Sequence, residues 1–252
     1  MSRQWTTAAL AALVAMAVTM PAVAAPAGEH PSVKRPFNLP PSMDLSYHID
    51  AKQRGFGLSG DAVVSWRLKG DSYTLTESTR ASILGKILEH KSEGTIDSYG
   101  IAPHTFFEKR FRKAPATTTF NRESKTITFT EGDERYPIKG GEQDRSTASW
   151  QLLAVARAAP EKFTPGSEWT FFVAGRHDAE QWIFKVINQE SVKTATGDVL
   201  AVHLAKAPPP DSKDQTVDLW LAPSLDWAPV RVRFTDANGD FVDQVLTKLT
   251  KK

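Results

Sequence analysis

The chain has 252 residues, a nearly even charge balance of 31 Lys and Arg against 29 Asp and Glu, and no cysteine. Without cysteine it cannot form disulfides, thiol-based catalytic sites, cysteine-ligated zinc sites or a lipid anchor on an N-terminal cysteine. The even charge gives no overall field that would attract nucleic acid or an anionic membrane.

The first 24 residues have the features of a secretory signal peptide. Arg3 supplies a positive start, an apolar run extends from Ala8 to Met20, and Ala22-Val23-Ala24 matches an A-x-A cleavage site. The apolar run is shorter than the roughly 18 to 20 residues that cross a bilayer. Cleavage after Ala24 predicts a periplasmic or secreted protein whose mature chain has neither a transmembrane segment nor a lipid anchor.

Five prolines fall between residues 25 and 42, which predicts an extended leader, because proline interrupts both helices and sheet ladders. Apolar and polar residues then alternate along most of residues 43–250, as in Ala62–Leu68 and Val230–Phe234. Alternation broken by short turns, including Asn238-Gly239, predicts hairpin-linked strands. We expect about a dozen strands in meander order, forming one antiparallel sheet that curls into a half-barrel or barrel.

One segment has helical rather than strand periodicity. Residues 144–159 are apolar over most of the helix circumference and end before Pro160, and Asp144 or Ser146 can cap the start. Such a helix has to be covered on several sides, so we expect the curled sheet to wrap around it. A second stretch, residues 82–88, fits a short helix or an apolar loop or lip equally well.

Residues that often carry catalysis do not form a recognisable constellation. Gly55–Gly60 fits G-x-G-x-x-G, but a strand pattern follows it, which favours a glycine-rich hairpin turn over a phosphate-binding loop. There is no G-x-S-x-G motif, and the six histidines lack metal-ligand spacing. His177 is the one histidine that an acidic residue, Asp178, directly follows, and the pair falls in a turn. The sequence therefore predicts a protein that is not an enzyme and that holds no metal or cofactor.

Aromatic residues are abundant, with six tryptophans beyond Trp5. They fit either a packed core or a cavity between sheet and helix that admits a lipid or acyl chain. The residues expected to line such a cavity are Trp66, Trp150, Leu153, Trp182 and Phe184.

Four stretches, taken together and in order, resemble the bacterial exported family known as domain of unknown function 3108. They are Gly60–Trp66 with Tyr73–Leu75, Ser92–Ile96 with Gly100–Pro103, Gln143-Asp144 at the helix start, and Val217–Pro223 with Ala228–Val232. The resemblance spans about Leu45 to Leu246 and implies a periplasmic or envelope-associated β domain with no established activity. The expected architecture is also similar to that of periplasmic lipoprotein carriers, an analogy of fold alone.

Three hypotheses for the function follow. The first is an exported envelope protein that binds or carries an apolar ligand such as a lipid or acyl group. The alternative is a structural or protein-interaction module of envelope assembly with a solid core. The third is an unrecognised hydrolase acting near His177-Asp178. The expected partners are an apolar small molecule or an envelope protein, and not nucleic acid.

Overall fold

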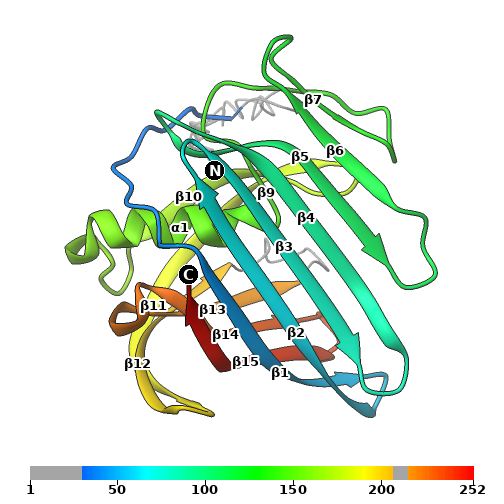
Figure 1. The fold of residues 1–252 in the computed structure, drawn as a ribbon, viewed down its shortest axis with the longest axis vertical. Helices are drawn as coiled ribbons and strands as arrows, with labels where there is room; N and C mark the ends of the chain where they lie inside the picture. Colours follow the sequence, from blue (N-terminus) through cyan, green and yellow to red (C-terminus); the bar gives the residue numbers. More distant parts are fainter. Residues whose placement is uncertain (1–29, 207–214) are drawn as a thin grey trace, which may run out of the picture.

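The computed structural model describes residues 30–206 and 215–252, in which fifteen strands form one continuous curled sheet (Figure 1). The prediction of a mostly β chain with one curled sheet around a helix is confirmed. The predicted signal peptide, residues 1–24, lies outside the described residues.

The sheet has two arms, which join where β1 pairs with β15. The first arm consists of β1 (Met43–Gln53), β2 (Phe56–Lys69), β3 (Ser72–Ala81), β4 (Gly85–Asp97), β5 (Gly100–Arg110), β6 (Ala116–Asn121), β7 (Thr126–Phe129) and β8 (Tyr136–Pro137). The second arm consists of β9 (Gln143–Asp144), β10 (Glu168–Ala174), β11 (Ala179–Thr194), β12 (Gly197–Lys206), β13 (Thr216–Ala222), β14 (Ala228–Thr235) and β15 (Phe241–Lys251).

Two details of the sequence prediction are wrong. The sheet has fifteen strands rather than about a dozen, because β7, β8 and β9 contain only four, two and two residues and are too short to show alternation. The sheet is also mixed, since β9 pairs in parallel with β10. A helix separates these two strands and carries the chain back along the sheet, so the second strand runs in the direction of the first.

The predicted helix is α1 (Thr147–Ala158), and its residues from 147 to 156 are buried apart from Ser149. It lies between the two arms of the sheet (Figure 1) and contacts β5, β9 and β10. Ser146 occupies the N-cap position without a side-chain capping bond. Asp144 caps instead, because its Oδ1 accepts the backbone N–H groups of Ser146 and Thr147 at 2.9 and 2.8 Å. Pro160 starts a 3₁₀ turn, Pro160–Lys162, as the chain leaves the helix.

The free edges of the two arms meet through side chains. Phe106, Phe120 and Ile127 of the first arm pack against Phe172 of β10 in a separate apolar cluster. Thr118 on β6 donates a hydrogen bond to the carbonyl of Gly175, just after β10, at 2.6 Å. These contacts close the curl of the sheet around α1.

Candidate functional site

The residues predicted to line a ligand cavity are packed against one another and against the rest of the core. Trp66, Trp150, Leu153 and Phe184 are at most 2% exposed, and the rings of Trp66 and Trp150 stack with centroids 5.0 Å apart. Trp182 is half-buried, and its ring meets Phe184 edge-on at 6.0 Å. Trp66, Trp150, Leu153 and Phe184 belong to the main apolar core and Trp182 packs against it, so side chains fill the region around them.

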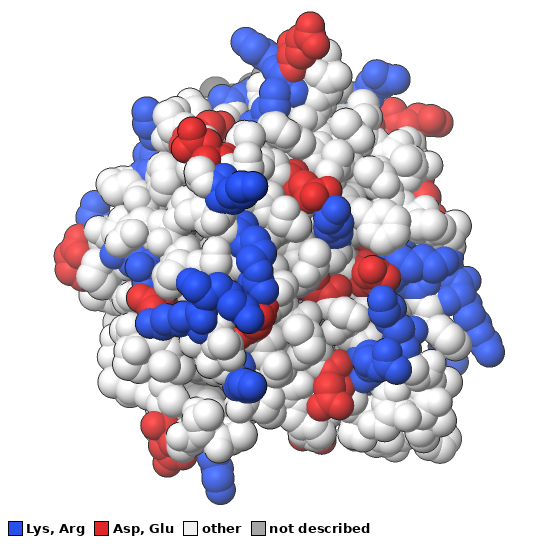
Figure 2. Space-filling view, in the orientation of Figure 1, with Lys and Arg blue, Asp and Glu red and all other residues white. Residues whose placement is uncertain are grey.

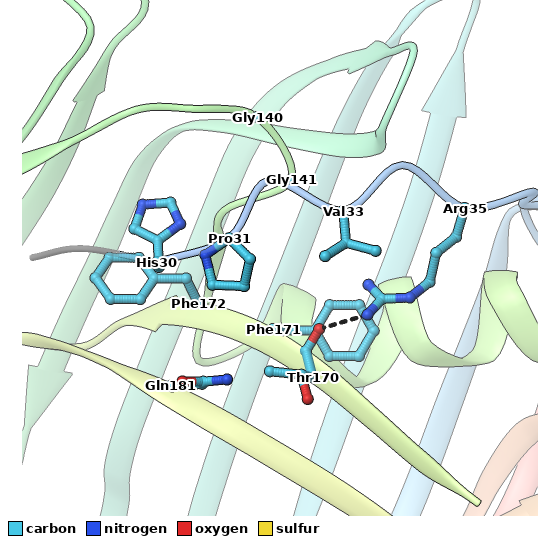
Figure 3. A pocket seen from close by; sticks show the side chains of 10 residues that line it. All are labelled: His30, Pro31, Val33, Arg35, Gly140, Gly141, Thr170, Phe171, Phe172 and Gln181. Atoms are coloured by element: carbon cyan, nitrogen blue, oxygen red, sulfur yellow. Dashed lines mark hydrogen bonds between the residues drawn. The ribbon is translucent and has the colours of Figure 1, made fainter. Parts of the chain in front are cut away.

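Two small depressions lie elsewhere on the molecule. The first has a volume of about 20 Å³, room for about one water molecule, and lies where residues 30–35 cross Phe171 and Phe172 (Figure 3). The second, of about 50 Å³, lies between the end of β1 and the β14–β15 hairpin. None of the five predicted cavity residues lines either depression.

Residues 30–42, which we call the N-terminal strap, run along the helix and β10. Asn38 donates its backbone N–H to the carbonyl of Ala154 in α1 at 2.8 Å. Arg35 donates to the carbonyl of Thr170 at 3.0 Å, and the ring of His30 stacks on Phe172 at 3.9 Å (Figure 3). The strap covers the side of the half-barrel where β10 and α1 meet.

Gln143 tethers the helix start to β5 on the far arm. Its Nε2 donates to the carbonyl of Ile101 at 2.7 Å, while Gln151 of α1 accepts the Ile101 N–H at 2.8 Å. A Cβ on Gly100 would lie 2.4 Å from the Gln151 side chain, so this glycine allows the close approach of helix and strand. Gln143 and Gly100, which both lie in stretches that carry the family resemblance, therefore act at one place.

Asp144 is at the centre of a buried polar chain. Ser92 on β4 donates to its Oδ2 at 2.5 Å, and the hydroxyl of Tyr73 on β3 lies 2.8 Å from the Ser92 hydroxyl. Burial raises the pKa of Asp144 to about 6, although the Ser92 hydroxyl and the helix N–H groups favour the ionised form. The chain of hydroxyls ties the helix start to two strands of the first arm.

A second charged group lies alongside, around Glu108 on β5. His90 contacts Glu77 at 2.9 Å and Glu108 at 3.2 Å, and Arg176 after β10 reaches Glu108 at 3.2 Å and Glu131 at 2.5 Å. Burial alone would lower the pKa of His90, but the two carboxylates outweigh it and raise the pKa to about 9. Burial alone would raise the pKa of Glu108, but His90 and Arg110 lower it to about 2. The group is therefore a network of ionised, mutually neutralised side chains.

Ser146, His90 and Glu108 superficially have the arrangement of a nucleophile, base and orienting carboxylate. The Ser146 hydroxyl lies 3.4 Å from His90 Nδ1. A general base has to be unprotonated at the working pH, and an imidazole with a pKa of about 9 is protonated near neutrality. Ser146 is also 3% exposed, which leaves no room for a substrate. The arrangement fits a structural role.

The remaining chemical candidates are dispersed. His177 Nε2 and Asp178 Oδ2 are 3.9 Å apart, and the histidine side chain is 62% exposed. Within residues 30–206 and 215–252, no three or more His, Asp or Glu side chains gather as a metal ion would require. No helix in the same part of the chain is long and apolar enough to cross a membrane.

Sequence reasoning missed the buried network of His90, Glu108 and Arg176. A signal for Glu108 was present, because it shares the inward face of β5 with Phe106, two residues before it. A charged residue in phase with buried apolar ones needs a partner of opposite charge. That partner, Arg176, is 68 residues away, and only the fold brings the two together.

Comparison with known proteins agrees with this architecture. The family model described as protein of unknown function (DUF3108) matches residues 46–247. The chain belongs to this family. No curated protein matches the DUF3108 chain. Its fold is similar to that of a β-barrel-like protein of domain of unknown function DUF1849 from Brucella abortus, with a TM-score of 0.55, 11% identity, and 86% of this chain and 99% of that one covered.

Two further solved structures are more distant. One is a Bacteroides fragilis protein named as exported, with a YmcC-like fold (TM-score 0.37, 9% identity, 87% of this chain and 100% of that one covered). The other is a Vibrio parahaemolyticus domain named for outer membrane lipoprotein sorting (TM-score 0.31, 8% identity, 84% and 86% covered). At these scores neither carries an argument about this DUF3108 chain.

Proposed function

We propose that this DUF3108 chain is an exported interaction module of the cell envelope that works through its surface, on a solid β core. The observation that carries the proposal is the filled space between sheet and helix, where Trp66, Trp150, Leu153 and Phe184 are at most 2% exposed. An acyl chain needs a pocket of at least about 300 Å³, many times the volume of either small depression. The features of residues 1–24 support export.

The buried charges support the same proposal. In an active site, perturbed groups face a cavity that a substrate can enter. Here His90 and Glu108 face each other, and Asp144 faces Ser92 and has no exposed surface. Groups arranged in this way fix the helix between the two arms of the sheet.

A second candidate is a carrier of an apolar ligand, the function that an unfilled interior would favour. The observation in its favour is the N-terminal strap, which lies over Phe171 and Phe172 and leaves a depression beneath it. A strap that moved away would uncover aromatic surface on β10. In this alternative the described arrangement is the form in which the strap is closed over β10.

Thermal unfolding with lauric acid as a probe separates the two candidates. The solid-core module predicts no saturable rise in the Tm of the wild-type chain, because there is no site for the acyl chain. Trp150→Ala should lower stability by about 3–5 kcal/mol and create a cavity that binds indole, which then raises the Tm of that variant alone. Trp182→Ala, at a half-buried position, is the matched control and should cost less.

Saturable stabilisation of the wild-type chain by lauric acid, abolished by Trp150→Ala, would contradict the solid-core proposal and support the carrier.

A further inference from the structure

Three hairpin turns of the first arm lie side by side at one end of the sheet. They connect β1 to β2, β3 to β4, and β5 to β6. The Ser82 N–H donates to the carbonyl of Ser59 at 3.0 Å, and the Phe111 N–H donates to the carbonyl of Ile87 at 2.8 Å, so each turn is tied to its neighbour. We call the surface formed by residues 52–58, 80–86 and 109–113 the hairpin end.

The hairpin end exposes large apolar side chains at the tips of its turns. Ile83 is 87% exposed, Phe56 73% and Leu84 53%. Leu58 and Phe111 are also exposed. The β1–β2 turn is a tight two-residue hairpin, in which Arg54 and Gly55 both have positive φ. Exposed residues of this size, gathered at one place, mark a contact surface.

Cationic side chains surround these apolar tips. The hairpin end contains eight Lys and Arg residues and no Asp or Glu, and all eight are exposed. Six of them form no ion pair with a carboxylate of the described residues: Lys52, Arg54, Arg80, Lys109, Arg112 and Lys113. Blue side chains gather at the lower right of Figure 2, where these hairpins end in Figure 1.

Acidic residues lie next to the hairpin end and at the opposite end of its strands. On the neighbouring β14–β15 hairpin, Asp240 accepts the backbone N–H of Arg54 at 2.8 Å. At the opposite end of the same strands, the turns at residues 69–71 and 121–125 each mix basic and acidic residues. The chain is nearly neutral overall, so the hairpin end has a local excess of positive charge.

We propose that the hairpin end docks on the surface of an anionic phospholipid bilayer, with Phe56, Ile83 and Leu84 inserted among the lipid headgroups and the surrounding Lys and Arg on the phosphates. Aromatic and aliphatic side chains flanked by basic ones suit this interface, because it is apolar below and negatively charged above. Ile83 and Leu84, two of the three inserted side chains, are aliphatic and offer no stacking surface for nucleic acid bases. The docking rests on the proposed surface function and names its partner.

Co-sedimentation with vesicles tests the apolar half of this proposal. The purified chain is mixed with vesicles of phosphatidylglycerol and phosphatidylethanolamine, or of phosphatidylcholine alone. All variants carry the same N-terminus, so any binding by the apolar run near residue 1 is common to them. The triple variant Phe56→Ser, Ile83→Ser, Leu84→Ser should lose at least about tenfold in partition to anionic vesicles. The matched control makes the same change at exposed apolar sites of the second arm: Ile183→Ser, Ile187→Ser and Leu200→Ser.

The charged half is tested with Lys52→Gln, Arg80→Gln and Lys113→Gln. These side chains form no ion pair with a described carboxylate, so their removal leaves no carboxylate unpaired. Partition should fall about 100-fold, and raising the salt concentration should release the wild-type chain. The control variant Lys69→Gln, Lys162→Gln, Lys193→Gln removes as many exposed charges elsewhere and should bind like wild type.

Circular dichroism and thermal melts check that every variant folds. Equal binding of the wild-type chain to anionic and neutral vesicles would overturn the docking proposal, and so would hairpin-end variants that bind like wild type. Binding to duplex DNA in place of vesicles would also overturn it. Each of these results leaves the lauric acid test unaffected, so failure of the docking and failure of the solid core can be told apart.

Discussion

The buried network around Glu108 and the hairpin end hold charged residues in opposite ways. Arg176 is 7% exposed and lies against the carboxylates of Glu108 and Glu131. Arg80 is exposed and forms no ion pair with any described carboxylate. Buried charges need partners within the protein, whereas exposed ones are solvated and can take a partner from outside. The first region therefore maintains the fold, and the second is available for binding.

The largest loss of stability is expected on replacing Arg176. Arg176→Ala leaves Glu108 buried with only His90 and Arg110 nearby, and it releases the tie between β5 and β10. Removing one partner of a buried pair costs about 3–5 kcal/mol, which urea unfolding measures. Arg80→Ala is the matched control and should change stability by less than about 0.5 kcal/mol. Equal effects of the two changes on the free energy of unfolding would contradict a stabilising role for the network around Glu108.

The stability that the network around Glu108 contributes should depend on pH through His90. The pKa of His90 is raised from 6.5 to about 9, so its protonated form is bound more tightly in the folded state. That contribution is fully present below about pH 6.5 and is lost as the pH rises through about 9. The stability difference between wild type and His90→Gln should shrink across this range. A difference that stays constant from pH 6 to 10 would refute the ion pairs with Glu77 and Glu108.

Asp144 has a dependence on pH in a lower range. Its pKa is raised from 3.8 to about 6, so the stability it contributes is present below about pH 4 and is lost as the pH rises through about 6. Asp144→Asn keeps an oxygen for the Ser146 and Thr147 N–H groups and should remove this pH dependence at a cost of about 1 kcal/mol or less. Asp144→Ala also removes the cap and should cost about 1–2 kcal/mol more. Unfolding curves between pH 4 and 7 test both.

The smallest effect on stability is expected at the hairpin end. The triple variant Phe56→Ser, Ile83→Ser, Leu84→Ser changes side chains that are at least 53% exposed. Each change should leave the free energy of unfolding within about 0.5 kcal/mol of wild type, while vesicle partition falls. A large loss of stability would mean that these tips pack within the molecule and would argue against a docking surface.

The sequence anticipates the parts of the fold that follow from local pattern. The helix before Pro160 and the strand alternation agree with the structure. The prediction of a turn for the G-x-G-x-x-G stretch holds only at its start, because Arg54-Gly55 form the turn and β2 begins at Phe56. Of the two alternatives for residues 82–88, the apolar loop is correct for Ser82–Leu84, which form an exposed turn, whereas residues 85–88 are part of β4.

Features that depend on distant residues could not be anticipated. β9 has only two residues, too few to show a strand pattern, so the sequence could not predict its parallel pairing with β10. Arg176 and Glu108 meet only because the sheet curls until its edges touch. A hollow interior and a filled one can contain the same number of aromatic residues. The composition therefore could not predict that Trp66 packs on Trp150.

The most direct test of the solid core is the native mass of the chain purified without detergent, compared before and after organic extraction. A solid core predicts the mass of the processed polypeptide alone, unchanged by extraction. A lipid-sized species in one-to-one ratio with the chain, removed by extraction, would contradict the account and establish that the interior opens to a ligand.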